Sequence, residues 1–227
     1  MGVIFDQLII GKTASLDDFD ASVKERRIYA PKKKSIKETV PFSNVTYDFS
    51  AINGEVYWEE RELEYVFEII ADNPEQLERK KTRFTNWIMN VMNEEIHDPY
   101  DPDWHYVGTF ESLDPVDDES MEKTTITVLF MAYPYNIANA LTVYTIKIPA
   151  ASSVEKTIKN DSSHRITPTL YASAEMTLEI GNASYTIPAG EVHDDSLTFD
   201  AGSTVITVRN QGCASCTLNI VFLEEVF

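Results

Sequence analysis

One segment of this sequence has the pattern of a helix, and most of the remainder alternates with the two-residue period of β-strands. The helix is predicted over residues 74–95, because Asn73 is a candidate N-cap, Pro74 suits the first turn, and apolar residues recur on one face. Its end is expected before the loop at 98–103, where prolines prevent continuation. The chain is therefore expected to be mainly β, with this helix covering a sheet.

The strands around the helix predict a first unit of α+β type over residues 1–137, a β-sheet or split barrel with one helix. Residues 57–71 alternate cleanly, with apolar side chains on one face and glutamates on the other. Residues 28–40 are extended and polar, and 114–122 form an acidic turn. Further strands are expected at 3–10, 104–113 and 124–133.

From residue 138 onward the helical period disappears, and Ser, Thr, Ala and Gly become more frequent. Short strand patterns recur with turn signals between them, among them the two-residue loop Gly181-Asn182. This pattern is typical of a β-sandwich, which we expect over residues 138–227. Its strands are predicted at 141–148, 167–172, 176–180, 184–187, 196–199, 204–209 and 217–223.

The charge balance excludes several kinds of partner. The chain has 19 basic and 37 acidic residues, a net charge of −18. Such a field repels phosphate backbones and anionic lipid surfaces, so neither specific nucleic-acid binding nor a membrane partner is expected. The first residues, Met1 to Gln7, lack the basic start of a secretory signal. We therefore expect the protein to be made and folded in a cytoplasm.

A basic island stands out against this acidic background. Residues 24–37 hold seven basic side chains and one acidic residue, Glu25. An extended basic arm could meet the acidic surface of a neighbouring copy and fix the register between subunits. A solvated loop explains the same composition equally well. The basic residues are Lys24, Arg26, Arg27, Lys32, Lys33, Lys34 and Lys37.

Other polar groups predict no enzymatic site. The loop at 97–105 offers Asp98, Asp101 and Asp103 as oxygen ligands for Ca²⁺, but it lacks the Gly and the closing Glu of an EF-hand. A solvated connection is the favoured interpretation. The run His193-Asp194-Asp195 lies in a polar turn without an accompanying nucleophile. No catalytic, cofactor-binding or metal-binding residue is therefore assigned.

Two further features of the second half carry weak signals. Cys213 and Cys216 form a lone CxxC in strand-like surroundings, which favours a turn that leads into the final strand over a redox or zinc site. Tyrosines could stack on a sugar ring, but residues 141–227 contain no Trp. The sequence is compatible with a sugar-binding site but does not predict one. The tyrosines are Tyr144, Tyr171 and Tyr185.

The order of several motifs resembles the N-terminal domain of siphophage distal tail proteins. An extended belt at 28–41 precedes Tyr47-Asp48-Phe49-Ser50 and the aromatic-x-x-Arg-x-Leu strand at 57–63. The helix follows, then Tyr106-Val107-Gly108, and finally an aromatic-Pro step in Ala132-Tyr133-Pro134-Tyr135. The second half is similar to the galectin-like or carbohydrate-module-like sandwich of the same family.

The resemblance implies a non-enzymatic protein of the virion tail tip. Six copies would form a ring at the end of the tail tube, in contact with the tail tube protein and the tail-associated hub protein. A receptor-binding protein or a host saccharide would be a further partner. The alternative function is a carbohydrate-binding adhesion module on the host cell wall; a cell-wall hydrolase is disfavoured. No cofactor is expected. The candidate ring contacts are Lys32, Lys33, Lys34, Lys37, Tyr133 and Tyr135.

Overall fold

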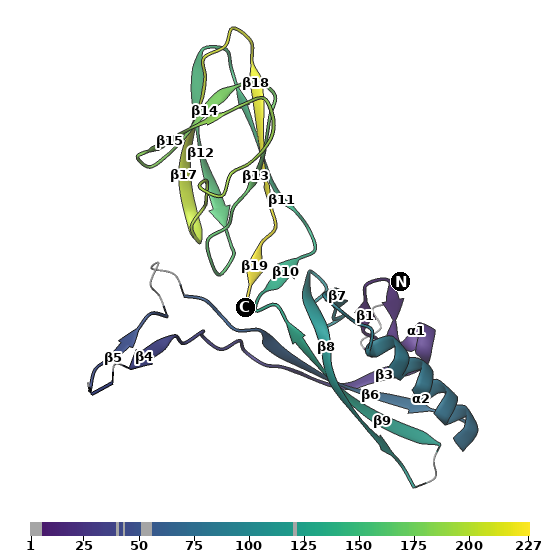
Figure 1. Ribbon diagram of the computed structural model, residues 1–227. Helices are drawn as coiled ribbons and strands as arrows, with labels where there is room; N and C mark the ends of the chain where they lie inside the picture. Colours follow the sequence, from purple (N-terminus) through teal and green to yellow (C-terminus); the bar gives the residue numbers. More distant parts are fainter. Residues whose placement is uncertain (1–5, 40, 43, 51–55, 120–121) are drawn as a thin grey trace. The chain divides into compact units, whose positions relative to one another are not determined.

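The computed structural model describes residues 6–39, 41–42, 44–50, 56–119 and 122–227, and the chain divides into two compact units. Unit 1 comprises Met1–Asn136 together with Phe227, and unit 2 comprises Ile137–Val226. Strands account for 54% of the structure and helices for 9%, so the prediction of a mainly β fold is confirmed. Figure 1 labels the elements.

Unit 1 is built on one antiparallel sheet with the strand order β2-β1-β7-β8-β9-β6-β3. The ten paired positions of β6 and β9, from Arg61↔Ala132 to Ile70↔Lys123, form its centre. The elements of this unit are β1 (Ile9–Ile10), β2 (Thr13–Ala14), α1 (Ser15–Phe19), β3 (Ala21–Ile28), β4 (Lys37–Thr39), β5 (Thr46–Asp48), β6 (Arg61–Ile70), α2 (Pro74–Ile88), β7 (Glu94–His97), β8 (Trp104–Asp117) and β9 (Lys123–Ala132).

The core of unit 1 lies between this sheet and α2. The alternating strand predicted at 57–71 is β6, and its apolar face is fully buried, as expected from the period of two. From α2, Leu77, Phe84 and Ile88 are buried on the same core, and the ring of Phe84 lies 4.9 Å from that of Phe67. Burial of these large side chains supplies most of the driving force for folding this unit.

The helix is shorter than predicted. Its start is confirmed, because the side chain of Asn73 accepts a hydrogen bond from the backbone N–H of Gln76 (2.9 Å). It ends at Ile88 and not at 95: the backbone N–H groups of Asn90 and Val91 bond to carbonyls only three residues back, those of Trp87 and Ile88. Asn93, in a left-handed conformation (φ 54°), then turns the chain into β7. The prediction of one helix also missed the short α1, which packs beside α2 through Phe19.

An arm, residues 29–60, leaves the sheet after β3 and returns to it at β6. Backbone hydrogen bonds tie its two sides together, from Glu59 N–H to Lys32 C=O (2.7 Å) and from Lys34 N–H to Tyr57 C=O (2.9 Å). Farther out, β4 and β5 form a separate two-stranded sheet. Nearly all of the described residues of the arm are exposed. As far as its described residues show, the arm is thus an extended ladder without a core of its own.

Unit 2 contains two four-stranded antiparallel sheets whose inner faces form a second core. The sheets have the orders β11-β18-β13-β16 and β12-β17-β14-β15. The hairpin predicted at Gly181-Asn182 joins β14 and β15. The elements are β10 (Asn136–Ala138), which starts at the last residue before this unit, β11 (Thr142–Ile148), β12 (Ser152–Asn160), β13 (Thr169–Ala172), β14 (Met176–Ile180), β15 (Ala183–Ile187), β16 (Gly190–His193), β17 (Gly202–Asn210), β18 (Cys216–Phe222) and β19 (Glu225–Val226).

The observed strands differ from the predicted ones in several places. The segment at 196–199 is not a strand; only Phe199 forms an isolated bridge, with Ile166. Conversely, β12 and β16 were not predicted, because their exposed faces leave few apolar residues to reveal the alternation. The strand predicted at 3–10 lies partly outside the described residues and is observed as Ile9–Ile10.

In the part of the chain that the structure describes, no helix is long and apolar enough to cross a membrane.

Candidate assembly surface

The structure divides the basic island into two parts. The side chains on β3 are neutralised inside unit 1: Lys24 pairs with Glu68 (2.9 Å), Arg26 with Asp98 (2.6 Å) and Arg27 with Glu64 (3.0 Å). The part beyond β3 is different. Lys32, Lys33, Lys34 and Lys37 are all exposed, and none of them forms an ion pair with a described residue.

The arm also exposes apolar side chains to an unusual degree. Ile36 is 55% exposed, Val45 53% and Tyr47 50%. The rings of Tyr47 and Phe49 stack on one another with centroids 6.4 Å apart, but both remain exposed. A two-stranded ladder is marginally stable in water, and contiguous exposed apolar surface marks sites of interaction. These features make the arm a candidate surface for contact with another molecule.

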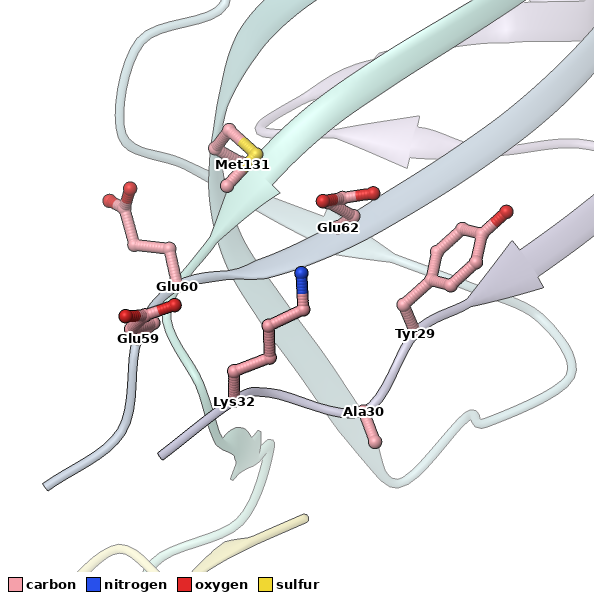
Figure 2. A pocket seen from close by; sticks show the side chains of 7 residues that line it. All are labelled: Tyr29, Ala30, Lys32, Glu59, Glu60, Glu62 and Met131. Carbon is pink, nitrogen blue, oxygen red and sulfur yellow. The ribbon is translucent and has the colours of Figure 1, made fainter. Parts of the chain in front are cut away.

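A hollow of about 400 Å³ lies where the arm joins the sheet (Figure 2). Lys32 on the outgoing strand shares it with Glu59 and Glu60 on the returning strand and with Glu62 of β6. The basic character of the arm is therefore confined to its outgoing strand, residues 32–39, and the returning strand is acidic. The sequence interpretation treated residues 24–37 as one basic arm and missed this second, acidic strand. The remaining lining residues are Tyr29, Ala30 and Met131.

The two tyrosines proposed as ring contacts differ in exposure. Tyr133 is 40% exposed, whereas Tyr135 is 8% exposed and packs against Phe227, with ring centroids 4.8 Å apart. Phe227 in turn lies 4.6 Å from the ring of Trp58 at the base of the arm. Tyr135 is thus occupied within unit 1. Participation of either tyrosine in a ring stays a prediction.

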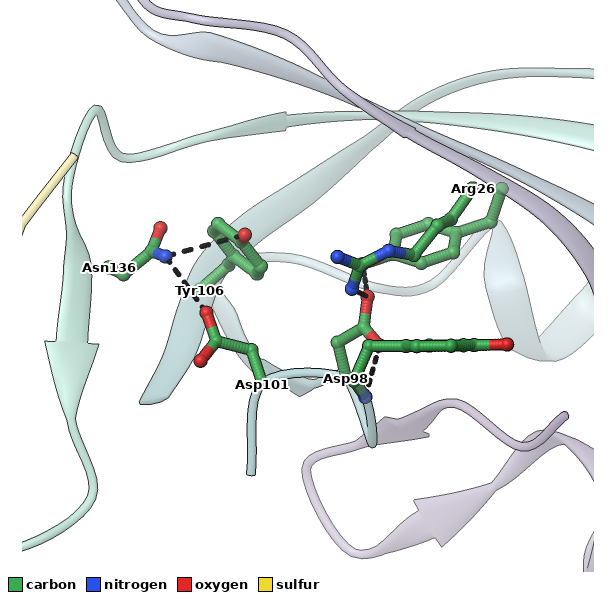
Figure 3. Close-up of polar contacts among 7 residues, drawn as sticks. Arg26, Asp98, Asp101, Tyr106 and Asn136 are labelled. Atoms are coloured by element: carbon green, nitrogen blue, oxygen red, sulfur yellow. Dashed lines mark hydrogen bonds and ion pairs between the residues drawn. The ribbon is translucent and has the colours of Figure 1, made fainter. Parts of the chain in front are cut away.

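The acidic loop at 97–105 is not the solvated connection expected from the sequence (Figure 3). Asp98 is 2% exposed, and its carboxylate accepts hydrogen bonds from Arg26 (2.6 Å), from the hydroxyl of Tyr65 (3.0 Å) and from the backbone N–H of Tyr100 (2.9 Å). Burial, followed by the charge of Asp98, raises the pKa of Tyr65 well above its usual value. The loop is therefore held to β3 and β6 by a buried carboxylate.

A second set of polar contacts continues this network. Asn136 donates to Asp101 and to the hydroxyl of Tyr106, each at 3.4 Å (Figure 3). It also accepts a hydrogen bond from Arg61 at 2.7 Å. Burial raises the pKa of Asp101 and lowers that of Arg61. Among the described residues, no group of three or more His, Cys, Asp or Glu side chains is placed to hold a metal ion. Through Asn136, the network joins Asp101 of the loop to Arg61 of β6.

The remaining candidates in unit 2 form no catalytic arrangement. His193 is exposed and lies 3.5 Å from Asp195, while Asp194 accepts hydrogen bonds from the hydroxyl and the backbone N–H of Ser196, which lower its pKa. These contacts are those of a turn. Cys213 and Cys216 are both free thiols; the second is buried at the start of β18, and burial raises its pKa.

The tyrosines of unit 2 have different environments. The hydroxyl of Tyr144 contacts the backbone of Lys159, and that of Tyr185 donates to the carbonyl of Ser196 (3.2 Å). Tyr171 is 42% exposed on the outer face of β13. Only Tyr171 of these three therefore presents a largely accessible ring.

Comparison with known proteins gives one informative similarity. No protein-family model matches the sequence, and no curated protein matches it significantly. The structure is similar to that of the phage SPP1 Dit (gp 19.1) protein, described as a paradigm of the hub adsorption apparatus in phages that infect Gram-positive bacteria. The TM-score is 0.68 at 15% sequence identity, over 96% of this chain and 98% of that chain.

A second solved structure, the phage P2 baseplate in its activated conformation with Ca, matches 87% of this chain and 90% of that chain. Its identity of 8% and TM-score of 0.35 are too low to support an argument. The similarity to SPP1 Dit spans both units of the chain and nearly all of the SPP1 protein. The chain thus has the fold of a phage distal tail protein over almost its full length.

Proposed function

We propose that this protein is a structural component of a phage tail tip, a distal tail hub that joins the tail tube to the host-adsorption apparatus. The observation that carries the proposal is the shared fold with SPP1 Dit over 96% of one chain and 98% of the other. A match confined to the sandwich would point only to a common β module. Agreement across both units supports a common role.

In this proposal, unit 1 forms a ring of six copies in the virion tail. A closed ring requires two different complementary surfaces on each copy, and a stable interface buries roughly 1,600 Å² in total. The exposed apolar side chains of the arm and its lysines, which form no ion pair with a described residue, supply one such surface, with Lys32, Lys33, Lys34 and Lys37 as contacts together with Tyr133. The neighbours along the tail axis would be the tail tube protein and the tail-associated hub protein.

Light scattering on the purified protein, over a concentration series at two salt concentrations, tests this assembly. A discrete mass of six chains that loosens at high salt is the expected result, because salt screens exposed charge contacts. The variant K32E/K33E/K34E should remain folded and lose the assembled species. The control K12E/K147E/K156E changes three exposed lysines that do not belong to the arm, with the same change of net charge, and should assemble like the wild type.

If the arm variant assembles as well as its control, the arm is not an assembly contact. If the wild type stays monomeric at every concentration, self-assembly into a ring is refuted for the isolated protein. Cryo-electron microscopy of virion tails would then show whether the protein occupies the distal end of the tube. Its absence from that position would reject the hub function itself.

One observation favours a second function, binding of a host cell-wall saccharide by unit 2. Tyr171 is exposed at the centre of an outer sheet face, where Asn219 and Glu191 are its register partners on β18 and β16. An aromatic ring beside amide and carboxylate groups can stack on a sugar and bond its hydroxyls. Titration with host wall fragments should then give binding that Tyr171→Ala abolishes. Equal binding by this variant would refute the site.

A further inference from the structure

Among the residues that the structure describes, the outer edge of β8 has no partner strand over much of its length, which makes it a second candidate surface. β9 follows one edge of β8 as far as Asp117, but β7 pairs with the other edge only between Tyr106 and Gly108. Beyond this point the described chain makes one more backbone contact, from Phe110 N–H to Val91 C=O (3.0 Å). The rest of the edge, residues 111–117, is largely exposed. An uncovered strand edge is a template for pairing with another chain.

The acidic composition of this edge favours a basic partner. Glu111 and Asp114 are exposed on it, and Asp117, Asp118 and Glu119 follow at its end. Lys81 pairs with Asp117 (2.8 Å) at the end of this edge, and Lys123 at the start of β9 is engaged with Glu68. Repulsion between like charges and the missing N–H of Pro115 prevent the edges of two such hairpins from pairing with each other. A lysine-bearing strand meets no such charge repulsion.

The outgoing strand of the arm has the matching properties. It carries Lys32, Lys33, Lys34 and Lys37 without ion pairs to described residues, and β4 within it pairs with β5 alone. Seven residues of β8 edge span about 23 Å and eight residues of the arm span about 26 Å, at roughly 3.3 Å per residue. Ile36 (55% exposed) and Val116 (62% exposed) supply apolar surface on the two sides.

The carboxylates at the base of the arm are a weaker candidate for the same lysines. Glu59, Glu60 and Glu62 already share their hollow with Lys32 of the same chain (Figure 2). We therefore propose that the outgoing strand of the arm, residues 32–39, docks along the β8 edge, residues 111–117, of a second copy of this chain. The inference rests on the proposed ring and names the surface that receives the arm.

A charge-exchange experiment tests this contact. One variant reverses the arm (K32E/K33E/K34E), and a second reverses the edge (E111K/D114K/E119K). The second variant spares the ion pair of Lys81 with Asp117 and the turn contacts of Asp118. Each variant alone should need at least a tenfold higher concentration for half-assembly than the wild type, measured by light scattering. A 1:1 mixture should assemble again, because each reversed surface then meets a reversed partner.

The control for the edge variant is E155K/E175K/E191K, which changes three exposed glutamates of unit 2 by the same charge. It should assemble like the wild type. If the edge variant also assembles like the wild type while the arm variant fails, the β8 edge is not the receptor and the ring proposal stands. If both variants fail and their mixture does not recover, the two surfaces do not meet each other. A wild-type protein that never assembles counts against the ring and this contact together.

Discussion

Replacement of Asp98 by alanine should destabilise unit 1 more than any substitution of a surface carboxylate. The side chain is 2% exposed and accepts three hydrogen bonds, from Arg26, from Tyr65 and from the backbone of Tyr100. The variant Asp98→Ala leaves the hydroxyl of Tyr65 buried without an acceptor. It also leaves the guanidinium of Arg26, whose side chain is 34% exposed, without its carboxylate.

The expected loss follows from these exposures. An unsatisfied buried hydroxyl costs about 1–3 kcal/mol. Breaking a fully buried ion pair costs about 3–5 kcal/mol, but Arg26 is one-third exposed, so water recovers part of this loss. We therefore expect a decrease of about 3 kcal/mol in the free energy of unfolding. For a urea dependence of about 1.5 kcal/mol per molar, the unfolding midpoint should fall by about 2 M.

Tryptophan fluorescence measures unit 1 selectively in this experiment. Trp58, Trp87 and Trp104 all lie in unit 1, so urea unfolding followed at this signal is not mixed with unfolding of unit 2. The control is Asp103→Ala, an exposed carboxylate in the same loop, which should change the free energy of unfolding by less than about 0.5 kcal/mol. A midpoint for Asp98→Ala that equals that of Asp103→Ala would show that the buried network does not stabilise the fold.

Three smaller effects follow from other parts of the structure. Burial raises the pKa of Asp101, so ionisation of this carboxyl lowers the stability of the folded state. Asp101→Asn should therefore stabilise unit 1 slightly at pH 7, and this gain should disappear as the pH falls below about 4, near the pKa of the carboxyl in the unfolded chain. A gain in stability that grows as the pH falls would contradict a raised pKa. Asn73→Ala removes the N-cap of α2 and should lower the free energy of unfolding by about 1 kcal/mol in the same fluorescence assay, and an unchanged midpoint would refute this cap. In the native protein, Ellman's reagent should modify Cys213 quickly and the buried Cys216 only after denaturation; two fast equivalents would contradict the burial of Cys216.

The sequence predicts the parts of this fold that depend on local pattern. The alternation in β6, the start of α2 and the Gly181-Asn182 hairpin are all visible in a few neighbouring residues. The end of α2 was missed because Val91 continues the apolar spacing while Asn93 already turns the chain. A buried residue that does not belong to a regular helix or strand pattern gives no local sign of where an element ends.

The candidate surface was only partly predictable for the same reason. The sequence identifies the four lysines beyond β3. It does not show that Arg26, in the same basic island, is neutralised, because its partner Asp98 lies 72 positions away in the sequence. The sequence predicts a strand at 104–113 and an acidic turn from residue 114, whereas β8 continues to Asp117. That its outer edge lacks a neighbour among the described residues depends on how the whole sheet is paired. Contacts between distant segments decide which charges remain exposed.

The sparse support of the arm also determines where a protease can cut. Trypsin needs an extended, locally unfolded segment with Lys or Arg, and the arm offers Lys32, Lys33 and Lys34 in an exposed ladder with few buried contacts. In the free chain, the first cleavage should therefore fall at these lysines and leave the two cores intact. Any molecule that covers the arm will slow this cleavage. The pattern of tryptic fragments thus records, without any label, whether the arm is bound.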